Sequence, residues 1–203
     1  MLDHDKYYFT YADIHETVRK LAEQLQASDF EPDVMVAIGT GGFIPARILR
    51  TYTKKPILTV GLAYYDMDNK PMEIPQKVQW IDEVQQKLSG KRILLVDEVD
   101  DSRATLEYCL RELLASRPLE VAVMVLHNKR KPKRGSLPPE VRRYWAGEEL
   151  EDRWICYPWD ALDIAAHEAQ ARHGAPEAVF PPRSPARNGG YPGRQDEAPP
   201  LRR

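Results

Sequence analysis

This sequence of 203 residues lacks several features that mark specialised classes of protein. Its only cysteines, Cys109 and Cys156, are too few for a disulfide-rich scaffold and do not have the spacing of a zinc site. No apolar run is long enough to cross a bilayer. The acidic N-terminus also lacks the apolar core of a signal peptide. We therefore expect reduced thiols and a cytoplasmic location.

The net charge of the chain does not point to a strongly charged partner. Lys and Arg together number 29 and Asp and Glu 31, so the net charge of -2 indicates neither nucleic acid nor an anionic membrane as a partner. The hydrophobic share of 42% is enough for a packed core. From residue 175 onward the chain is rich in Pro, Gly and Arg and poor in apolar residues. We expect one folded domain over residues 1–174 and a disordered tail over residues 175–203.

The most informative stretch is KRILLVDEVDDSRATL, residues 91–106. Ile93–Val96 is an apolar run typical of a strand that is buried on both faces. Four acids follow within five residues, and then Ser102 and Thr105 open a helical pattern. The acids are Asp97, Glu98, Asp100 and Asp101. Ligands of open α/β sheets bind where such a strand ends.

Carboxylates suit a metal ion or ribose hydroxyls, and the start of a helix suits a phosphate. A ligand with both parts is a phosphorylated sugar that carries Mg²⁺. Two alternatives stay open: a solvated turn at the start of a helix, and a phospho-acceptor pocket like that of a receiver domain. Because four acids at close range repel one another, the cluster favours a ligand that brings a cation.

The rest of the chain predicts alternating helices and strands. Thr10 and Asp13 resemble a capping box at the start of a first amphipathic helix. Strands are predicted over residues 34–38, 57–62, 93–96 and 120–126, with a possible late strand over 153–157. Further helices are predicted over residues 43–52, 81–88, 104–116 and 163–172. Residues 63–78 are predicted to form a long polar loop. This order indicates an α/β fold with a parallel sheet and right-handed crossovers.

Three other segments fit either a functional or a plain structural role. Gly39–Gly42 follows a strand but is neither a dinucleotide fingerprint nor a P-loop, so it is an anion-binding loop or a tight turn. The basic run Lys129–Arg134 is a nuclear-localisation motif, a solvated loop, or a source of lysines for an anion. Trp154 and Trp159 are core aromatics or stacking platforms.

Taken together, these segments resemble the type I phosphoribosyltransferases. Val96–Leu106 is similar to the motif with which that family binds phosphoribosyl pyrophosphate (PRPP). Three segments resemble the 6-oxopurine branch, most closely the fungal hypoxanthine/xanthine/guanine phosphoribosyltransferases: Ile38–Arg47, Val125–Lys129 and Trp154–Asp160. The resemblance covers about residues 7–173. It implies the twisted parallel sheet of that fold, a small hood, a mobile lid near residues 64–76, and a homodimer.

The resemblance also implies roles for the phosphoribosyl half of a site. Asp97 and Glu98 would hold the ribose hydroxyls and Mg²⁺. The 5-phosphate would lie in a loop formed by Asp101, Ser102, Arg103, Ala104 and Thr105. Thr40 and Gly41 match the pyrophosphate loop, where the family often has a non-proline cis peptide. Arg103 departs from the glycine that most of the superfamily carries, and Arg has less access to positive φ.

For the purine half, Asp101 would be the general base near N7 and Lys129 would donate to the 6-oxo group. Trp154 would stack on the base, Ile155 would contact its edge through the backbone, and Asp160 would lie beside a second Mg²⁺. The resemblance thus implies a Mg²⁺-dependent purine salvage enzyme that uses PRPP and a purine base. A non-catalytic nucleotide-sensing regulator and a transferase for another base, such as uracil, stay open. The sequence does not rank guanine, hypoxanthine and xanthine.

Overall fold

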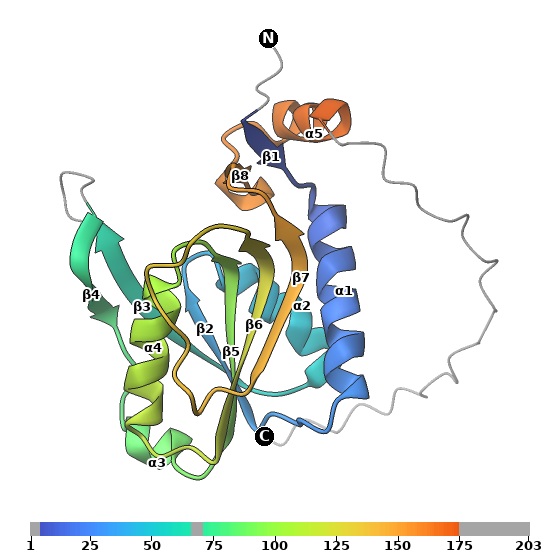
Figure 1. Cartoon of the computed structure of the whole chain (residues 1–203). Coiled ribbons are helices and arrows are strands. Elements are labelled where there is room, and N and C mark those ends of the chain that lie inside the picture. Colours follow the sequence, from blue (N-terminus) through green and yellow to red (C-terminus); the bar gives the residue numbers. More distant parts are fainter. Residues whose placement is uncertain (1–4, 66–70, 175–203) are drawn as a thin grey trace, which may run out of the picture.

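A six-stranded sheet forms the centre of this computed structural model, which describes residues 5–65 and 71–174 (Figure 1). The strand order is β4-β3-β2-β5-β6-β7, and all neighbours are parallel except the antiparallel pair β3–β4. The strands are β2 (Val34–Gly39), β3 (Ile57–Tyr65), β4 (Pro71–Gln79), β5 (Arg92–Asp100), β6 (Glu120–Lys129) and β7 (Arg143–Leu150). The predicted α/β fold with a mostly parallel sheet is confirmed.

Helices cover both faces of the sheet, which explains the continuous apolar runs of its central strands. In β5, Leu94 and Val96 pack in the core on the side of α1 and α2, whereas Ile93 and Leu95 pack in the core on the side of α3 and α4. The helices are α1 (Tyr11–Ala27), α2 (Phe43–Thr53), α3 (Val84–Leu88) and α4 (Ala104–Leu114). This alternation holds the end of β5 between two packed layers.

The predicted capping box starts α1. The backbone N–H of Asp13 donates to Thr10 Oγ1 at 3.1 Å, and the backbone N–H of Thr10 donates to Asp13 Oδ2 at 2.8 Å. Such reciprocal bonds satisfy two helix-end donors. They begin the helix at Tyr11, as the sequence predicts.

A small second layer lies above the carboxyl ends of the central strands (Figure 1). It contains the parallel two-stranded sheet of β1 (Lys6–Tyr8) and β8 (Trp154–Cys156), followed by α5 (Ile164–Gly174). The hydroxyl of Tyr157 donates to the backbone oxygen of Glu98 at 3.1 Å. This bond ties the second layer, which we call the hood, to the end of β5.

Three sequence predictions about secondary structure need correction. Residues 63–78 are not one long loop, because β3 extends to Tyr65 and β4 covers Pro71–Gln79. The edge strand β4 can carry prolines, since its outer side forms no ladder. Strand β7 was not predicted, and α3 begins only at Val84. The late strand predicted over residues 153–157 exists as β8.

Two other predictions lie partly or wholly outside the described residues. The predicted lid overlaps residues 66–70, and the predicted tail is residues 175–203. Within the described ranges, no helix has the length and apolar character needed to cross a membrane.

Candidate active site

A cavity of about 480 Å³ opens at the carboxyl end of β5, where the sequence predicts a ligand. The acids at the end of the strand line one side of it, and the loop that leads into α4 lines another. Its lining includes Asp97, Glu98, Asp101, Ser102, Arg103 and Thr105. The structure therefore gathers most of the predicted phosphoribosyl half of the site around one cavity.

Asp97 and Glu98 form a close acidic pair at the inner end of this cavity. Asp97 is only 6% exposed, and its Oδ1 accepts the backbone N–H of Glu98 at 3.0 Å. Burial raises the pKa of Asp97 well above its usual value, and the neighbouring charge of Glu98 raises it further. A cation or a hydroxyl donor would offset both effects. The pair is thus suited to bind such a group.

The glycine-rich turn after β2 lies directly against this pair. A Cβ on Gly41 would be 2.0 Å from the side-chain carboxyl carbon of Glu98, so the turn packs directly against this acid and a larger residue would push the Glu98 side chain aside. The peptide between Gly39 and Thr40 is cis. Of the two interpretations left open, a simple tight turn does not account for this close approach to an acid of the cavity. The contact favours a ligand-binding loop.

The donors present fit Mg²⁺ only in part. Magnesium takes about six oxygen ligands, usually one or two carboxylates plus water and substrate phosphates. Among the described residues, no group of three or more His, Cys, Asp and Glu side chains could hold a metal ion. Asp160 is exposed at the end of a short 3₁₀ helix, Pro158–Asp160, in the hood. Asp97 and Glu98 would therefore share the ion with oxygens of the substrate.

The predicted phosphate loop, residues 101–105, runs from the end of β5 into the first turn of α4. Arg103 occupies the left-handed region at φ 68°, although the sequence argument gave Arg poor access to it. Ser102 Oγ accepts the backbone N–H of Ala104 at 3.4 Å. The backbone N–H groups of Arg134 and Gly135 donate to the backbone oxygen of Ser102 at 3.0 and 3.1 Å. The segment after β6 thus packs against the phosphate loop.

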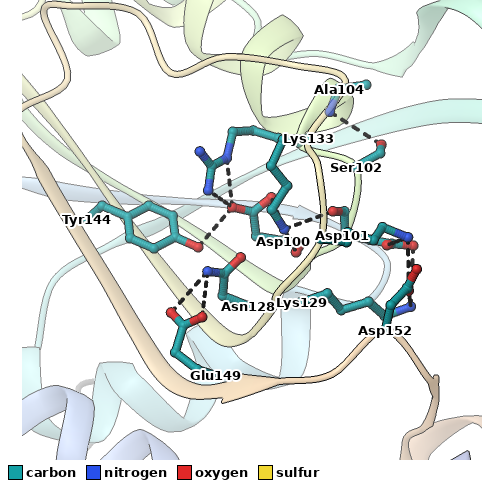
Figure 2. Close-up of polar contacts among 12 residues, drawn as sticks. Asp100, Asp101, Ser102, Ala104, Asn128, Lys129, Lys133, Tyr144, Glu149 and Asp152 are labelled. Atoms are coloured by element: carbon teal, nitrogen blue, oxygen red, sulfur yellow. Dashed lines mark hydrogen bonds and ion pairs between the residues drawn. The ribbon is translucent and has the colours of Figure 1, made fainter.

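Asp101, predicted as the general base, takes part in an ion cluster with two lysines (Figure 2). Lys129 Nζ lies 3.5 Å from Asp101 Oδ2 and 3.5 Å from Asp152 Oδ1. Lys131 Nζ lies 2.5 Å from Asp101 Oδ1 and 3.0 Å from Asp152 Oδ1. The structure therefore brings the predicted base and the predicted purine donor together, although Asp101 follows β5 and Lys129 is the last residue of β6.

The other predicted purine contacts lie in the hood. Trp154 is 68% exposed, whereas Ile155 beside it is buried. Trp159 stacks on Tyr157 with the ring centres 4.5 Å apart. Of the two tryptophans, Trp159 therefore has a packing role, and Trp154 presents a free ring face of the kind that can stack on a ligand. Neither Trp154 nor Ile155 lines the cavity at β5.

Several polar residues near the site are not predicted from the sequence. Lys131 and Asp152 contact the predicted base and purine donor, and Tyr144 and Lys133 contact the acid Asp100, which had no predicted role. The basic run after β6 was a signal for the two lysines. Tyr144 lies on the unpredicted strand β7, so no local pattern pointed to it.

A buried histidine lies beneath this region and predicts a pH effect on stability. Folding lowers the pKa of His127 to about 3 because its ring is buried. The unfolded chain, with a histidine pKa near 6.5, therefore binds a proton that the folded chain rejects. Above pH 6.5, His127 is neutral in both states and does not lower the free energy of unfolding. As pH drops from 6.5 toward 3, the free energy of unfolding falls by up to about 1.4 kcal/mol per pH unit.

We expect His127→Gln to remove this part of the pH slope in urea unfolding measured from pH 7.5 to 5. His15→Gln is the matched control, since His15 is exposed on α1 and should leave the slope as it is. An unchanged slope in His127→Gln would contradict the assignment, whatever the variant's absolute stability.

Comparisons with known proteins match this chain to phosphoribosyltransferases. A family model described as the phosphoribosyl transferase domain matches residues 10–151. The hypoxanthine-guanine phosphoribosyltransferase of Schizosaccharomyces pombe is 41% identical over 197 residues, which is 83% of this chain and 95% of the relative. Xanthine phosphoribosyltransferase 1 of Saccharomyces cerevisiae is 37% identical over 204 residues, covering 85% and 98%.

Among solved structures, a hypothetical protein from Neisseria gonorrhoeae with bound ppGpp is similar at a TM-score of 0.79. It is 49% identical, and the match covers 84% of this chain and 98% of that one.

Proposed function

This chain belongs to the phosphoribosyltransferase family, and from that membership we propose that it transfers the 5-phosphoribosyl group of PRPP to N9 of a 6-oxopurine. The products are pyrophosphate and a purine nucleoside monophosphate. The relatives named for hypoxanthine, guanine and xanthine support purine salvage as the class of reaction.

One observation carries the proposal most directly: the 3.5 Å approach of Lys129 Nζ to Asp101 Oδ2 at the edge of the acidic cavity. A general base of the phosphoribosyl loop and a cationic donor for a purine oxygen then lie beside each other. A purine placed there could contact both groups at once, since N7 and O6 lie on the same edge of the ring.

On the phosphoribosyl side, the residues of this chain bind and orient PRPP. Asp97 and Glu98 accept hydrogen bonds from the ribose hydroxyls, and the turn proposed to bind the pyrophosphate packs against the Glu98 side chain at Gly41. The loop over residues 101–105 receives the 5-phosphate. Asp97 and Glu98 would hold Mg²⁺, which would neutralise charge on the leaving pyrophosphate.

On the purine side, the chain positions the nucleophile and accepts its proton. The bond between C1 of the ribose and pyrophosphate breaks as the bond from N9 to C1 forms. The carboxylate of Asp101 takes the proton that the base loses at N7. Lys129 donates to the 6-oxo group, and the ring of Trp154 covers a face of the base. An acceptor with a 6-amino group would present a donor to Lys129 instead.

The test is nucleotide formation from PRPP and Mg²⁺ with guanine, hypoxanthine and xanthine offered separately and in competition. Product from at least one of the three is expected, with adenine and uracil as controls that give far less. Absence of product from all three bases would sink the proposal. The competition arm ranks the bases, which the side chains of this chain do not do.

Lys129→Met should weaken the use of 6-oxopurines in particular. Loss of one charged donor to a buried oxygen costs roughly 1–3 kcal/mol, which is about a 10–100-fold drop in kcat/KM. KM for PRPP should change far less. Lys20→Met is a matched control, because Lys20 is exposed on α1. If adenine and hypoxanthine lose activity equally in Lys129→Met, the lysine does not read the 6-position.

A second candidate is a nucleotide-sensing regulator without catalysis. The Neisseria protein with bound ppGpp supports it, because that structure shows a guanine nucleotide in a close relative. Binding of ppGpp by this chain, together with no turnover of PRPP and any base, would favour this role. Turnover that depends on Asp101 would exclude it.

We further propose that residues 1–174 are the catalytic unit and that it works as a cytoplasmic homodimer. The family match ends at residue 151, and the last described helix ends at Gly174, which supports the boundary. A chain that ends at Gly174 is expected to keep kcat within about twofold of the full chain. A large loss of kcat would refute this, and sedimentation of both chains tests the dimer.

A further inference from the structure

Arg103 is an unusual residue for the start of α4. It stands at φ 68° and ψ -3°, in the left-handed region that costs a side-chain-bearing residue about 1–2 kcal/mol relative to its ordinary conformations. Glycine would adopt this conformation freely. A long charged residue at this position therefore needs interactions that offset the strain.

The side chain of Arg103 supplies those interactions through Asp100. Its Nε and Nη2 donate to Asp100 Oδ2 at 2.9 and 2.7 Å. Asp100 is fully buried, and the hydroxyl of Tyr144 donates to the same oxygen at 2.9 Å. The guanidinium also lies over the Tyr144 ring, 5.5 Å from its centre. A buried carboxylate is tolerated only with such partners.

Lys133 joins the same cluster from the segment after β6. Its Nζ donates to the backbone oxygens of Asp100 and Asp101 at 2.6 and 2.9 Å, and it lies 3.5 Å from Asp100 Oδ1. Gly135, two residues later, packs against the phosphate loop: a Cβ there would be 2.6 Å from the backbone oxygen of Arg103. The loop of residues 101–105 is therefore held by its own Arg103 through Asp100, and by Lys133 and Gly135 of the segment after β6.

We propose that Asp100, Arg103 and Lys133 are positioning residues, which hold the loop of residues 101–105 in the shape that receives the 5-phosphate of PRPP. This inference rests on the proposed function and adds residues to it. The guanidinium of Arg103 acts on the loop through Asp100, and its charge is balanced there. This role explains both Asp100, which has no role predicted from the sequence, and the left-handed backbone of Arg103.

The proposal differs from direct phosphate binding by Arg103 in what Asp100→Asn does. If Arg103 bound the phosphate directly, Asp100→Asn would free the guanidinium, and PRPP binding would be unchanged or tighter. If the pair positions the loop, Asp100→Asn and Arg103→Gln each weaken PRPP binding about tenfold or more, and the double variant loses little beyond either single one. Arg103→Gly separates the backbone from the side chain, because it relieves the strain but removes the anchor.

The experiment measures PRPP binding by calorimetry with Mg²⁺, and also KM and kcat for PRPP and for the purine. The expected result for Asp100→Asn, Arg103→Gln, Arg103→Gly and Lys133→Met is weaker PRPP binding with KM for the purine unchanged. Arg103→Lys should restore part of the loss. The matched control is Arg117→Gln, since Arg117 also has positive φ, at 56°, but is exposed beyond the end of α4.

Failure of the positioning role and failure of the proposed function give different results. Wild-type binding of PRPP by Asp100→Asn and Arg103→Gln would overturn the positioning role, even with full activity in the wild-type chain. A kcat loss without change in PRPP affinity would overturn it too. Failure of the proposed function would show instead as a wild-type chain that binds PRPP but forms no nucleotide. If Asp100→Asn does not fold, the Arg103 variants decide, because the Arg103 side chain is one-fifth exposed, at 21%.

Discussion

Asp101→Asn is expected to lower kcat by about 10²–10⁴-fold, the usual contribution of a general base, while KM for PRPP changes little. Asn keeps the shape of the side chain and can still accept a hydrogen bond, but it cannot take a proton from the purine. Steady-state rates with each 6-oxopurine check the kcat. A single-turnover measurement then shows whether the loss lies in the chemical step or in product release.

Asp152→Asn is the matched control for this experiment. Asp152 contacts the same two lysines as Asp101, with Oδ1 3.5 Å from Lys129 Nζ and 3.0 Å from Lys131 Nζ, but it does not line the acidic cavity. If Asp101 acted only by balancing lysine charge, both variants would lose similar activity. We expect Asp152→Asn to lose less than about tenfold. A kcat for Asp101→Asn close to that of Asp152→Asn would rule out the base.

Much of the fold could be predicted because the central strands are apolar on both faces. The runs that became β2, β5 and β6 pack between two layers of helices, and that burial leaves a clear sequence signal. Strand β7 gives no such signal, since it forms the edge of the sheet and its residues are mostly half-buried. Strand β4, also at an edge, carries prolines and polar residues and was predicted as a loop.

The gathering of the acids and the predicted phosphate loop around one cavity could be predicted for a different reason. The acids and the phosphate loop are consecutive in sequence, so they lie close together whatever the strand order of the sheet. The cluster around Asp100 was not predictable, because Tyr144 and Lys133 reach it from β7 and from the segment after β6. Contacts between distant segments depend on strand order, which local patterns do not report. The assignment of Asp160 to a metal stays a prediction, since its side chain is exposed in the hood.

The other large effect is expected at Asp97, where function and stability should oppose each other. Asp97→Asn should abolish most PRPP turnover, because it removes a carboxylate from the pair that we propose binds ribose and Mg²⁺. It should also make the protein without ligand more stable. The folded state raises the pKa of Asp97 through burial and through Glu98, so the unfolded chain ionises first as pH rises. The carboxyl therefore contributes no cost below its ordinary pKa of about 3.9.

Above that value, ionising the buried carboxyl lowers the free energy of unfolding progressively until pH reaches the raised pKa. Asp97→Asn removes this cost, so its gain in melting temperature over wild type should be large at pH 8 and small at pH 4. Asp33→Asn is the control: Asp33 also accepts a backbone N–H, from Arg92 at 2.8 Å, but it is exposed and far from the cavity lining. Mg²⁺ with PRPP should stabilise wild type more than Asp97→Asn, because only wild type offers two carboxylates to the ion. A variant that melts lower than wild type at pH 8 would show that Asp97 serves packing, and the opposition between stability and activity at this acid would be disproved.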